Sequence, residues 1–201
     1  SLPVARCYGK NSSIPRDDLA VLTRRSGRRE PMEARDLYIG NGPKGLGVYA
    51  GRTILPGERI LTFTGPLIDF VGTLALGERE GDALQIGLDL YIYLDQPGRY
   101  VNHSCRPNAG IVEDRILVAL SPIFPDDEIC YDYSTTMKED HWTMACLCGS
   151  PACRREIRDF TTLSPDLQQW YLGQGIVQRF LTPQPATVPH VQPLSLPEVS
   201  I

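Results

Sequence analysis

The sequence predicts a mostly β domain of short strands in small sheets, followed by one helical segment and a proline-rich tail. Two observations predict it. Brief apolar or alternating segments are separated by glycine and proline turn signals, which favours small sheets over βαβ units. Helical apolar spacing appears clearly only near the C-terminus.

Length and composition describe an ordinary globular chain. Its 201 residues suffice for one domain with a sizeable core, and 42% hydrophobic with 22% charged residues is typical. A net charge of −4 gives no strong sign of direct nucleic-acid binding, and it is compatible with a basic peptide substrate. No apolar run could span a bilayer and no signal peptide is present, so we expect an intracellular protein without membrane contact. Nothing indicates an oligomeric state.

The first 35 residues are basic and irregular, and they contain four clustered arginines: Arg24, Arg25, Arg28 and Arg29. We expect a solvated arm here, and a nucleic-acid contact is the weaker alternative. An alternating segment starts at Leu37–Ile39 and leads into the glycine-rich stretch 41–47. Short strands follow, with turns at Pro56-Gly57 and Gly65-Pro66.

Three later segments alternate or are apolar in the manner of strands, namely 90–95, 116–120 and 128–133, whereas 69–84 is weakly patterned and could hold a helical turn. A helix is predicted over 164–181, because Ser164-Pro165 is a start signal and apolar residues recur at helical spacing. Gly173 and Gly175 weaken that helix. Proline recurs after Thr182, which indicates an extended tail.

Six cysteines are present, and three of them form Cys146-x-Cys148-x4-Cys153. This spacing is poor for disulfides and suits a tetrahedral zinc ion, which in structural sites takes four ligands. Cys7, Cys105, Cys130 and the three histidines are candidates for the fourth ligand, and spacing does not choose among them. Such clustering indicates a reducing compartment.

Three motifs then occur in order: "NHSCRPN" at 102–108, "EICYDY" at 128–133 and the cysteine run. Together with "KGLGVYA" upstream, they resemble the SET-domain protein lysine methyltransferases that carry a cysteine-rich post-SET segment. The resemblance covers roughly 36–158. It implies short β-sheets, with a knot-like crossing between the NHS motif and the strand of the final tyrosine.

The resemblance also implies a division of the chain. We expect an N-terminal arm at 1–35, the SET domain at 36–135, a post-SET zinc segment at 136–158, a C-terminal helical segment at 159–182 and a proline-rich tail at 183–201. The implied reaction is methyl transfer from S-adenosylmethionine to a lysine amine.

The family's functional residues carry over by position. Tyr133 is the expected catalytic residue, and Tyr131 is expected to limit the product to mono-methylation, with di-methylation as the further step. The implied cofactor-binding residues are Lys44, Gly45, Leu46, Gly47, Arg99, Asn102, His103, Tyr133 and Leu147. The implied zinc ligands are Cys105, Cys146, Cys148 and Cys153.

The reaction requires a neutral lysine amine. The pKa of lysine is about 10.4, so keeping the amine neutral at pH 7 costs about 4–5 kcal/mol. A narrow apolar channel and a nearby sulfonium lower that pKa.

The expected substrate is a lysine-containing protein, with a histone tail preferred and a non-histone protein as the alternative. From another class, the chain could be an inactive zinc-stabilised protein-binding module. We expect the nucleus in a eukaryote and the cytoplasm in a bacterium.

Overall fold

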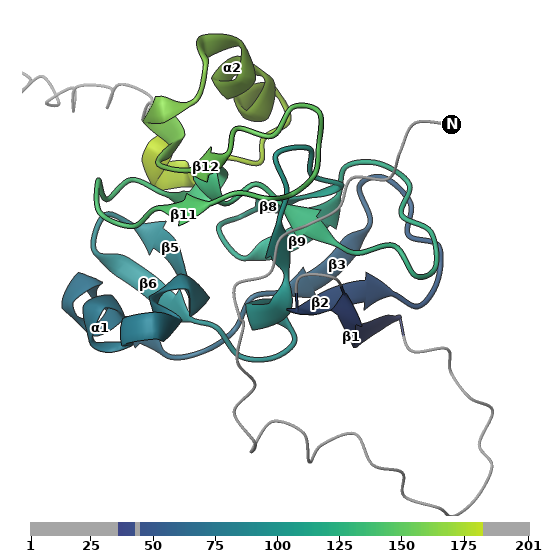
Figure 1. Cartoon of the computed structure of the whole chain (residues 1–201), viewed down its shortest axis with the longest axis horizontal. Coiled ribbons are helices and arrows are strands. Elements are labelled where there is room, and N and C mark those ends of the chain that lie inside the picture. The colour runs from purple at the N-terminus through teal and green to yellow at the C-terminus, as the bar shows by residue number, and fades with distance from the viewer. Residues whose placement is uncertain (1–35, 43–44, 183–201) are drawn as a thin grey trace, which may run out of the picture.

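A computed structural model describes residues 36–42 and 45–182 of the chain. The predicted N-terminal arm with its arginines, Lys44 and the proline-rich tail from residue 183 lie outside the described residues. The described part is mostly β, as predicted (Figure 1). Its strands are β1 (Leu37–Gly42), β2 (Gly45–Ala50), β3 (Arg59–Thr62), β4 (Leu67–Ile68), β5 (Ala83–Gly87), β6 (Leu90–Tyr93), β7 (Asn102–His103), β8 (Ala109–Val112), β9 (Ile116–Ala119), β10 (Cys130–Tyr131), β11 (Met144–Ala145) and β12 (Glu156–Ile157).

These strands form small sheets rather than one large one. β1 pairs with β2, β11 with β12 and β10 with β7, while β3-β9-β8 and β4-β6-β5 are three-stranded. The predicted turns have physical causes. Gly57 has φ +80° and Gly65 has φ +143°, a conformation that L side chains rarely adopt. At Gly65 a Cβ atom would also lie 1.9 Å from the carbonyl oxygen of Tyr93.

The helices are short. α1 (Phe70–Ala75) begins where the Asp69 side chain accepts a hydrogen bond from the Gly72 amide at 2.7 Å. α2 (Pro165–Gly173) is shorter than the predicted 164–181 helix, because the chain turns at Gly175, which has φ +67°. The 3-10 turns are η2 (Gly77–Asp82), η3 (Gly98–Tyr100), η4 (Tyr133–Thr136), η5 (Phe160–Thr162) and η6 (Arg179–Leu181).

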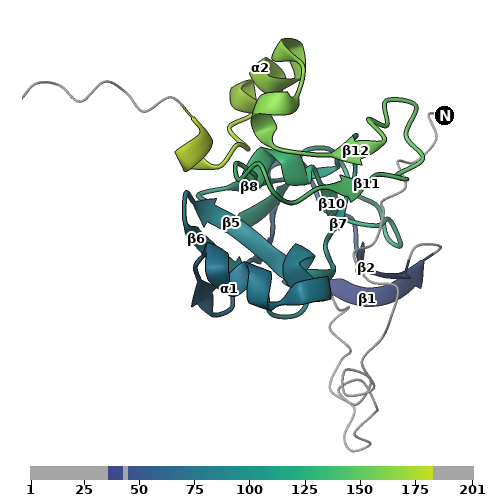
Figure 2. The same cartoon turned by 60° about the vertical axis from the view of Figure 1, so that its left-hand side comes forward.

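The parallel pair β7 and β10 brings two distant motifs side by side at the centre of the molecule (Figure 2). Asn102 lies opposite Cys130, and His103 lies opposite Tyr131. The Ser104 amide donates to the Tyr131 carbonyl at 3.1 Å, which extends the pairing. The NHS motif and the strand leading to Tyr133 therefore meet, as the resemblance implied.

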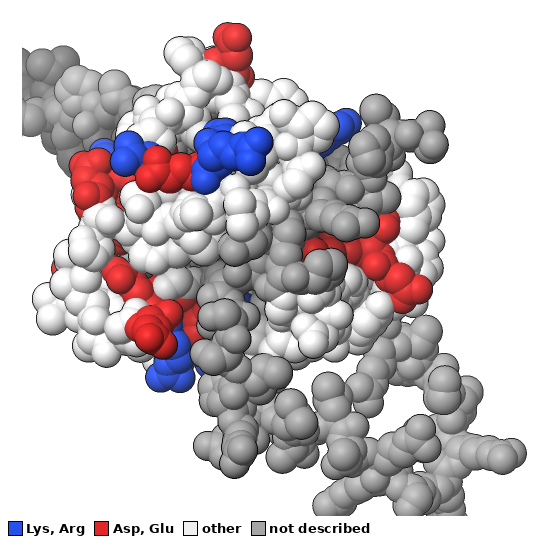
Figure 3. Space-filling view, viewed as in Figure 1, with Lys and Arg blue, Asp and Glu red and all other residues white. Residues whose placement is uncertain are grey.

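Two apolar clusters stabilise this arrangement. The larger one packs the sheets around buried residues such as Phe63, Ile92 and Leu117. The second packs Tyr171 of α2 and Ile176 with other C-terminal residues. Within the described part of the chain, no helix is long and apolar enough to cross a membrane. On the face of the molecule that Figure 3 shows, acidic and basic groups are interspersed over the described residues, without a broad basic area.

Candidate active site and metal centre

Four cysteine sulfurs converge beside β7, three from the segment around β11 and β12 and one from the NHS motif. The Sγ atoms of Cys105, Cys146, Cys148 and Cys153 all lie within 4.8 Å of one another. The Cys105–Cys146 and Cys153–Cys146 sulfur distances are both 3.6 Å. A tetrahedral zinc ion with bonds of about 2.3 Å separates its sulfur ligands by about 3.8 Å. The donor set and its spacing therefore fit zinc.

Cys105 is the residue that completes this cluster, among the candidates that the sequence left open. Cys130 is disulfide-bonded instead and is not part of it, and Cys7 lies outside the described residues. Hydrogen bonding from Cys146, assisted by His103, lowers the pKa of the Cys105 thiol to about 3 although burial opposes the shift. These contacts favour the thiolate form of Cys105, which is the form that binds metal.

His103 lies next to this cluster with a side chain that has no exposed surface. Its Nδ1 accepts a hydrogen bond from the Tyr133 amide at 3.2 Å. Its Nε2 lies 3.3 Å from Cys105 Sγ. The imidazole therefore faces protein groups on both sides, between the metal cluster and the backbone of Tyr133.

Asp132 is fully buried and connects three parts of the chain. Arg154 donates to both carboxylate oxygens, at 2.7 and 2.8 Å, and the Tyr171 hydroxyl donates at 2.6 Å. Burial alone would raise the pKa of this carboxyl, but the hydrogen bonds and charge of Arg154 and the hydrogen bond from Tyr171 hold it below its ordinary value. The charged carboxylate thereby joins β10, the cysteine segment and α2.

Tyr131 and Tyr133 pack against each other, with ring centroids 4.8 Å apart. The Tyr133 hydroxyl donates to the Val101 carbonyl at 2.9 Å, and its ring meets His103 edge-on. Burial raises the pKa of both phenols above the ordinary value. Both tyrosines are therefore neutral at physiological pH, and they can orient a ligand by hydrogen bonding but cannot act as phenolate bases.

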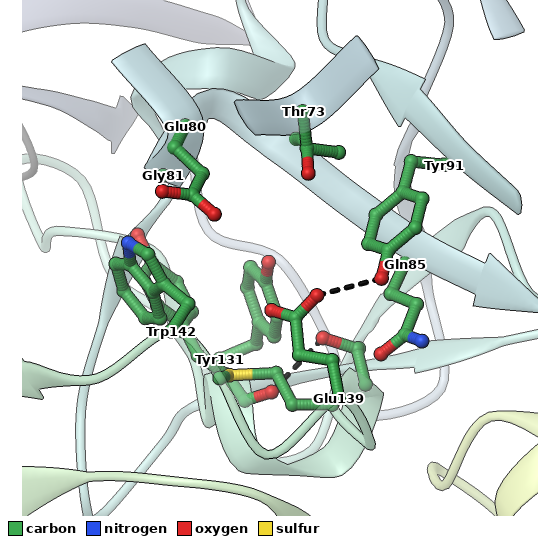
Figure 4. A pocket seen from close by; sticks show the side chains of 12 residues that line it. Thr73, Glu80, Gly81, Gln85, Tyr91, Tyr131, Glu139 and Trp142 are labelled. Atoms are coloured by element: carbon green, nitrogen blue, oxygen red, sulfur yellow. Dashed lines mark hydrogen bonds between the residues drawn. The ribbon is translucent and has the colours of Figure 1, made fainter. Parts of the chain in front are cut away.

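Both tyrosines line a pocket of about 410 Å³, counted out to its opening to solvent (Figure 4). Its other walls come from two regions of the chain: Thr73, Glu80, Gly81, Ala83, Gln85 and Tyr91 on one side, and Thr136, Met137, Glu139 and Trp142 on the other.

Two carboxylates lie in this pocket. Glu139 accepts a hydrogen bond from the Tyr91 hydroxyl at 2.6 Å. Burial raises the pKa of Glu139, and the charge of Glu80 adds to the shift, although the Tyr91 bond opposes it. Glu80 Oε1 is buried without a hydrogen-bond donor, and His141 Nε2 lies 3.4 Å from it. The lining contains no lysine or arginine among the described residues, so the pocket suits a cationic group with an alkyl chain.

The glycine-rich segment ends in strand β2, beside Asn102. Gly45 has φ +97°, and a Cβ atom at Gly47 would lie 2.6 Å from Glu128 Oε1 and 3.2 Å from Asn102 Nδ2. Asn102 Nδ2 donates to the Leu46 carbonyl at 2.9 Å and to Glu128 at 2.7 Å. The side chains of Glu128 and Asn102 therefore pack directly against the backbone of Gly47, which leaves no room for a Cβ atom there.

Two other expected cofactor residues lie differently. Arg99 donates from Nε to the Leu94 carbonyl at 3.0 Å, and its guanidinium lies over the Tyr93 ring. Leu147, between two cluster cysteines, is 53% exposed, which leaves an apolar side chain available to cover a ligand.

The family model for the SET domain matches residues 45–134. Residues 45–134 form a SET domain. The probable histone-lysine N-methyltransferase set-23 of Caenorhabditis elegans is 32% identical over 139 residues, covering 56% of this chain and 55% of that protein. The histone-lysine N-methyltransferase trr of Drosophila melanogaster is 31% identical over 130 residues, covering 56% of this chain and 5% of that protein. The chain thus spans only part of the length of these relatives.

A solved structure supports the same fold. The crystal structure of Arabidopsis thaliana SUVH6 in complex with SAM aligns with a TM-score of 0.50 at 24% identity, covering 61% of this chain and 32% of that one. The SET domain and the mostly β fold predicted from the sequence are therefore confirmed. The zinc-binding property of the post-SET segment stays a prediction.

Within the SET domain, the sequence motifs named the tyrosines but not the groups around them. Glu80 and Glu139 come from separate elements and belong to no motif. Arg154 and Tyr171 lie beyond residue 134, where the family model ends. The position of Arg154 directly after the last cluster cysteine was the one signal that could have drawn attention to it.

Proposed function

We propose that this chain is an S-adenosylmethionine-dependent protein lysine N-methyltransferase. The observation that carries the proposal is the pocket, in which two buried, neutral tyrosines meet two carboxylates and aromatic walls. A lysine side chain matches that lining, because its ammonium is attracted by carboxylates and its alkyl chain packs against aromatic rings. The SET domain and relatives named histone-lysine N-methyltransferases support the same reaction.

In the proposed mechanism the carboxylates of Glu80 and Glu139 attract the substrate ammonium into the pocket. The neutral phenols of Tyr131 and Tyr133 and the side chains of Met137 and Trp142 line the same pocket. Desolvation in the pocket lowers the pKa of the lysine amine, so the ammonium releases its proton to water. The neutral amine is then held in line with the methyl group that it attacks. The Tyr133 hydroxyl orients the amine and the methyl group, assisted by nearby carbonyls.

S-adenosylmethionine, when bound, supplies the electrophilic methyl group on its sulfonium. We assign its binding to the backbone of Gly45, Leu46 and Gly47, to Lys44, and to the region around Asn102 and His103, with Arg99, Tyr133 and Leu147 at its margins. The fit rests on the glycine backbone at Gly45 and Gly47, where side chains are excluded.

We assign zinc to Cys105, Cys146, Cys148 and Cys153. Four thiolates leave no open coordination position, so the metal is structural rather than catalytic. Since Cys105 lies in the SET domain and the others in the post-SET segment, zinc would hold the exposed Leu147 against the cofactor region.

Tyr131 sets the product in this proposal. Its hydroxyl occupies space beside Tyr133, and it can hold the amine of a singly methylated lysine in an unreactive orientation. Mono-methylation is therefore the expected outcome, with di-methylation as the further product. A histone tail is the preferred substrate, because the relatives are named for histone lysines, and a nuclear location follows in a eukaryote. A non-histone protein is the alternative.

The test is transfer of a radiolabelled methyl group from S-adenosylmethionine to core histones and to peptide arrays, with the modified sites mapped. Tyr133→Phe is the matched control, and its turnover should fall by about 10²–10³-fold, as when one catalytic hydrogen-bond donor is removed. Labelling of arrays but not histones would favour the non-histone substrate. If cofactor binds, nothing is labelled and Tyr133→Phe binds partners normally, the chain is a binding module.

A further inference from the structure

The sulfur of Cys105 is connected by hydrogen bonds to both sides of Tyr133. One connection runs through His103, whose Nε2 lies 3.3 Å from the sulfur and whose Nδ1 accepts from the Tyr133 amide at 3.2 Å. The other starts at the Arg154 amide, 3.4 Å from the same sulfur, and continues through the Arg154 guanidinium to Asp132. Residue 133 is thus held from its own amide and from the preceding side chain.

The His103 connection has a defined direction. A backbone amide can only donate, so Nδ1 must be unprotonated where it meets Tyr133. With Nδ1 as the acceptor for Tyr133, Nε2 is the ring nitrogen that faces Cys105 Sγ, at 3.3 Å. Thiolate ligands of metals are commonly fixed by such hydrogen bonds from neighbouring groups, and these partners tune metal affinity.

The surroundings of His103 leave it little freedom. Its side chain is fully buried, its strand pairs in parallel with β10, and its ring packs edge-on against Tyr133 with centroids 5.3 Å apart. A change at the sulfur therefore reaches the Tyr133 backbone through one rigid ring.

We propose that His103 is a positioning residue that couples the metal centre to Tyr133, acting through its side chain on the protein rather than on the cofactor. The coupling to catalysis rests on the proposed function, whereas the hydrogen-bonded link itself does not. Through this link the zinc cluster would also fix the amide of Tyr133, in addition to holding the post-SET segment.

Two substitutions of His103 each remove one of its two hydrogen bonds and keep a polar atom near the other. Asparagine places a polar atom near the position of Nδ1 but cannot reach Cys105. Glutamine places an amide nitrogen near the position of Nε2 but loses the acceptor for Tyr133. We expect His103→Asn to bind zinc about 10–100-fold more weakly than wild type, the range for partners of metal ligands.

His103→Gln should instead keep its zinc affinity within a few-fold of wild type, with kcat reduced at least 10-fold at unchanged substrate KM. Zinc affinity is measured by competition with a chromogenic chelator, and kcat is measured with a substrate that wild type labels in the methyl-transfer assay. A histidine that only fills the core would lower both quantities together in both variants. That outcome, or no effect in either variant, would overturn the proposal.

Nitrogen-15 NMR of the full-length, zinc-loaded wild type tests the link without any variant. We expect the His103 proton on Nε2 and a scalar coupling between His103 Nδ1 and the Tyr133 amide nitrogen across their hydrogen bond. A proton on Nδ1 overturns the proposal. Because these readouts and the zinc affinities need no methyl transfer, a protein that shows them while labelling no substrate supports the link and removes only the proposed function.

Discussion

Replacing Arg154 by methionine should be the most damaging change on the surface of the cysteine segment around β11 and β12. The substitution keeps much of the side-chain volume but removes two hydrogen bonds to Asp132 and one to Ser134 Oγ at 3.2 Å. The Asp132 carboxylate, which has no exposed surface, would keep the Tyr171 hydroxyl and the Ser134 amide as donors. It would then be a buried anion without a cation beside it in hydrogen-bond contact.

The expected cost follows from that geometry. Removing one partner of a buried ion pair costs about 3–5 kcal/mol, which for a chain of this size lowers Tm by roughly 6–20 °C. Arg158→Met is the matched control, because Arg158 pairs with Glu156 on the same segment at 3.0 Å while both side chains are about half exposed. Such an exposed pair contributes about 0–1 kcal/mol.

The pH dependence gives the sign of the effect. In wild type the pKa of Asp132 is below its ordinary value, so its contribution to the free energy of unfolding is present at neutral pH and is lost as pH falls below about 4. Without Arg154, burial should raise that pKa above the ordinary value. The folded variant then binds a proton more readily than the unfolded chain, and its deficit should shrink as pH falls from 7 toward 5.

Urea unfolding of the zinc-loaded proteins at several pH values, followed by tryptophan fluorescence, measures these differences. Trp170 is a local reporter, because its ring packs against Tyr171. Asp132→Asn combined with Arg154→Met should recover part of the loss, since no buried charge remains. A deficit for Arg154→Met that equals that of Arg158→Met, or that does not change with pH, would refute the reasoning.

Three further predictions concern product, metal and packing. Tyr131→Phe should raise the methylation state of the product by mass spectrometry, because it removes the hydroxyl beside the amine; abundant trimethyl product from wild type would contradict this. Zinc chelation and Cys105→Ser should each weaken S-adenosylmethionine binding in calorimetry, and unchanged zinc stoichiometry in Cys105→Ser would mean that the fourth ligand is elsewhere. Gly110→Ala should cost about 1–3 kcal/mol in urea unfolding, because its Cβ atom would lie 2.7 Å from Ile176. Gly173→Ala, with nothing within 4 Å, is the control, and an equal cost in both would contradict the packing argument.

The sequence was most informative where function constrains neighbouring residues. Tyr131 and Tyr133 stand in one short motif, and three cluster cysteines stand in another, so local spacing identified both. Cys105 was left as one of several candidates, because its approach to Cys146 spans 41 residues of chain. The two residues meet because the turn after β7 and the segment around β11 and β12 lie together in the fold.

The sequence also could not predict which way individual side chains point. Position in the motif assigned Arg99 to the cofactor, yet its guanidinium lies over Tyr93 and its Nε donates to Leu94. The hydrogen-bond partners of Asp132 are Arg154 and Tyr171, which lie 22 and 39 residues away in the chain. Such contacts depend on how separate elements pack, which no local pattern encodes.

The buried carboxylate of Asp132 also decides where the domain can be cut. A fragment ending at residue 134, where the family model ends, would discard both Arg154 and Tyr171 and leave this anion facing water or apolar surface. It would also retain Cys105 without the other three sulfurs. The smallest piece that can be excised with its interior intact therefore extends through α2, and we expect shorter fragments to be insoluble when expressed alone.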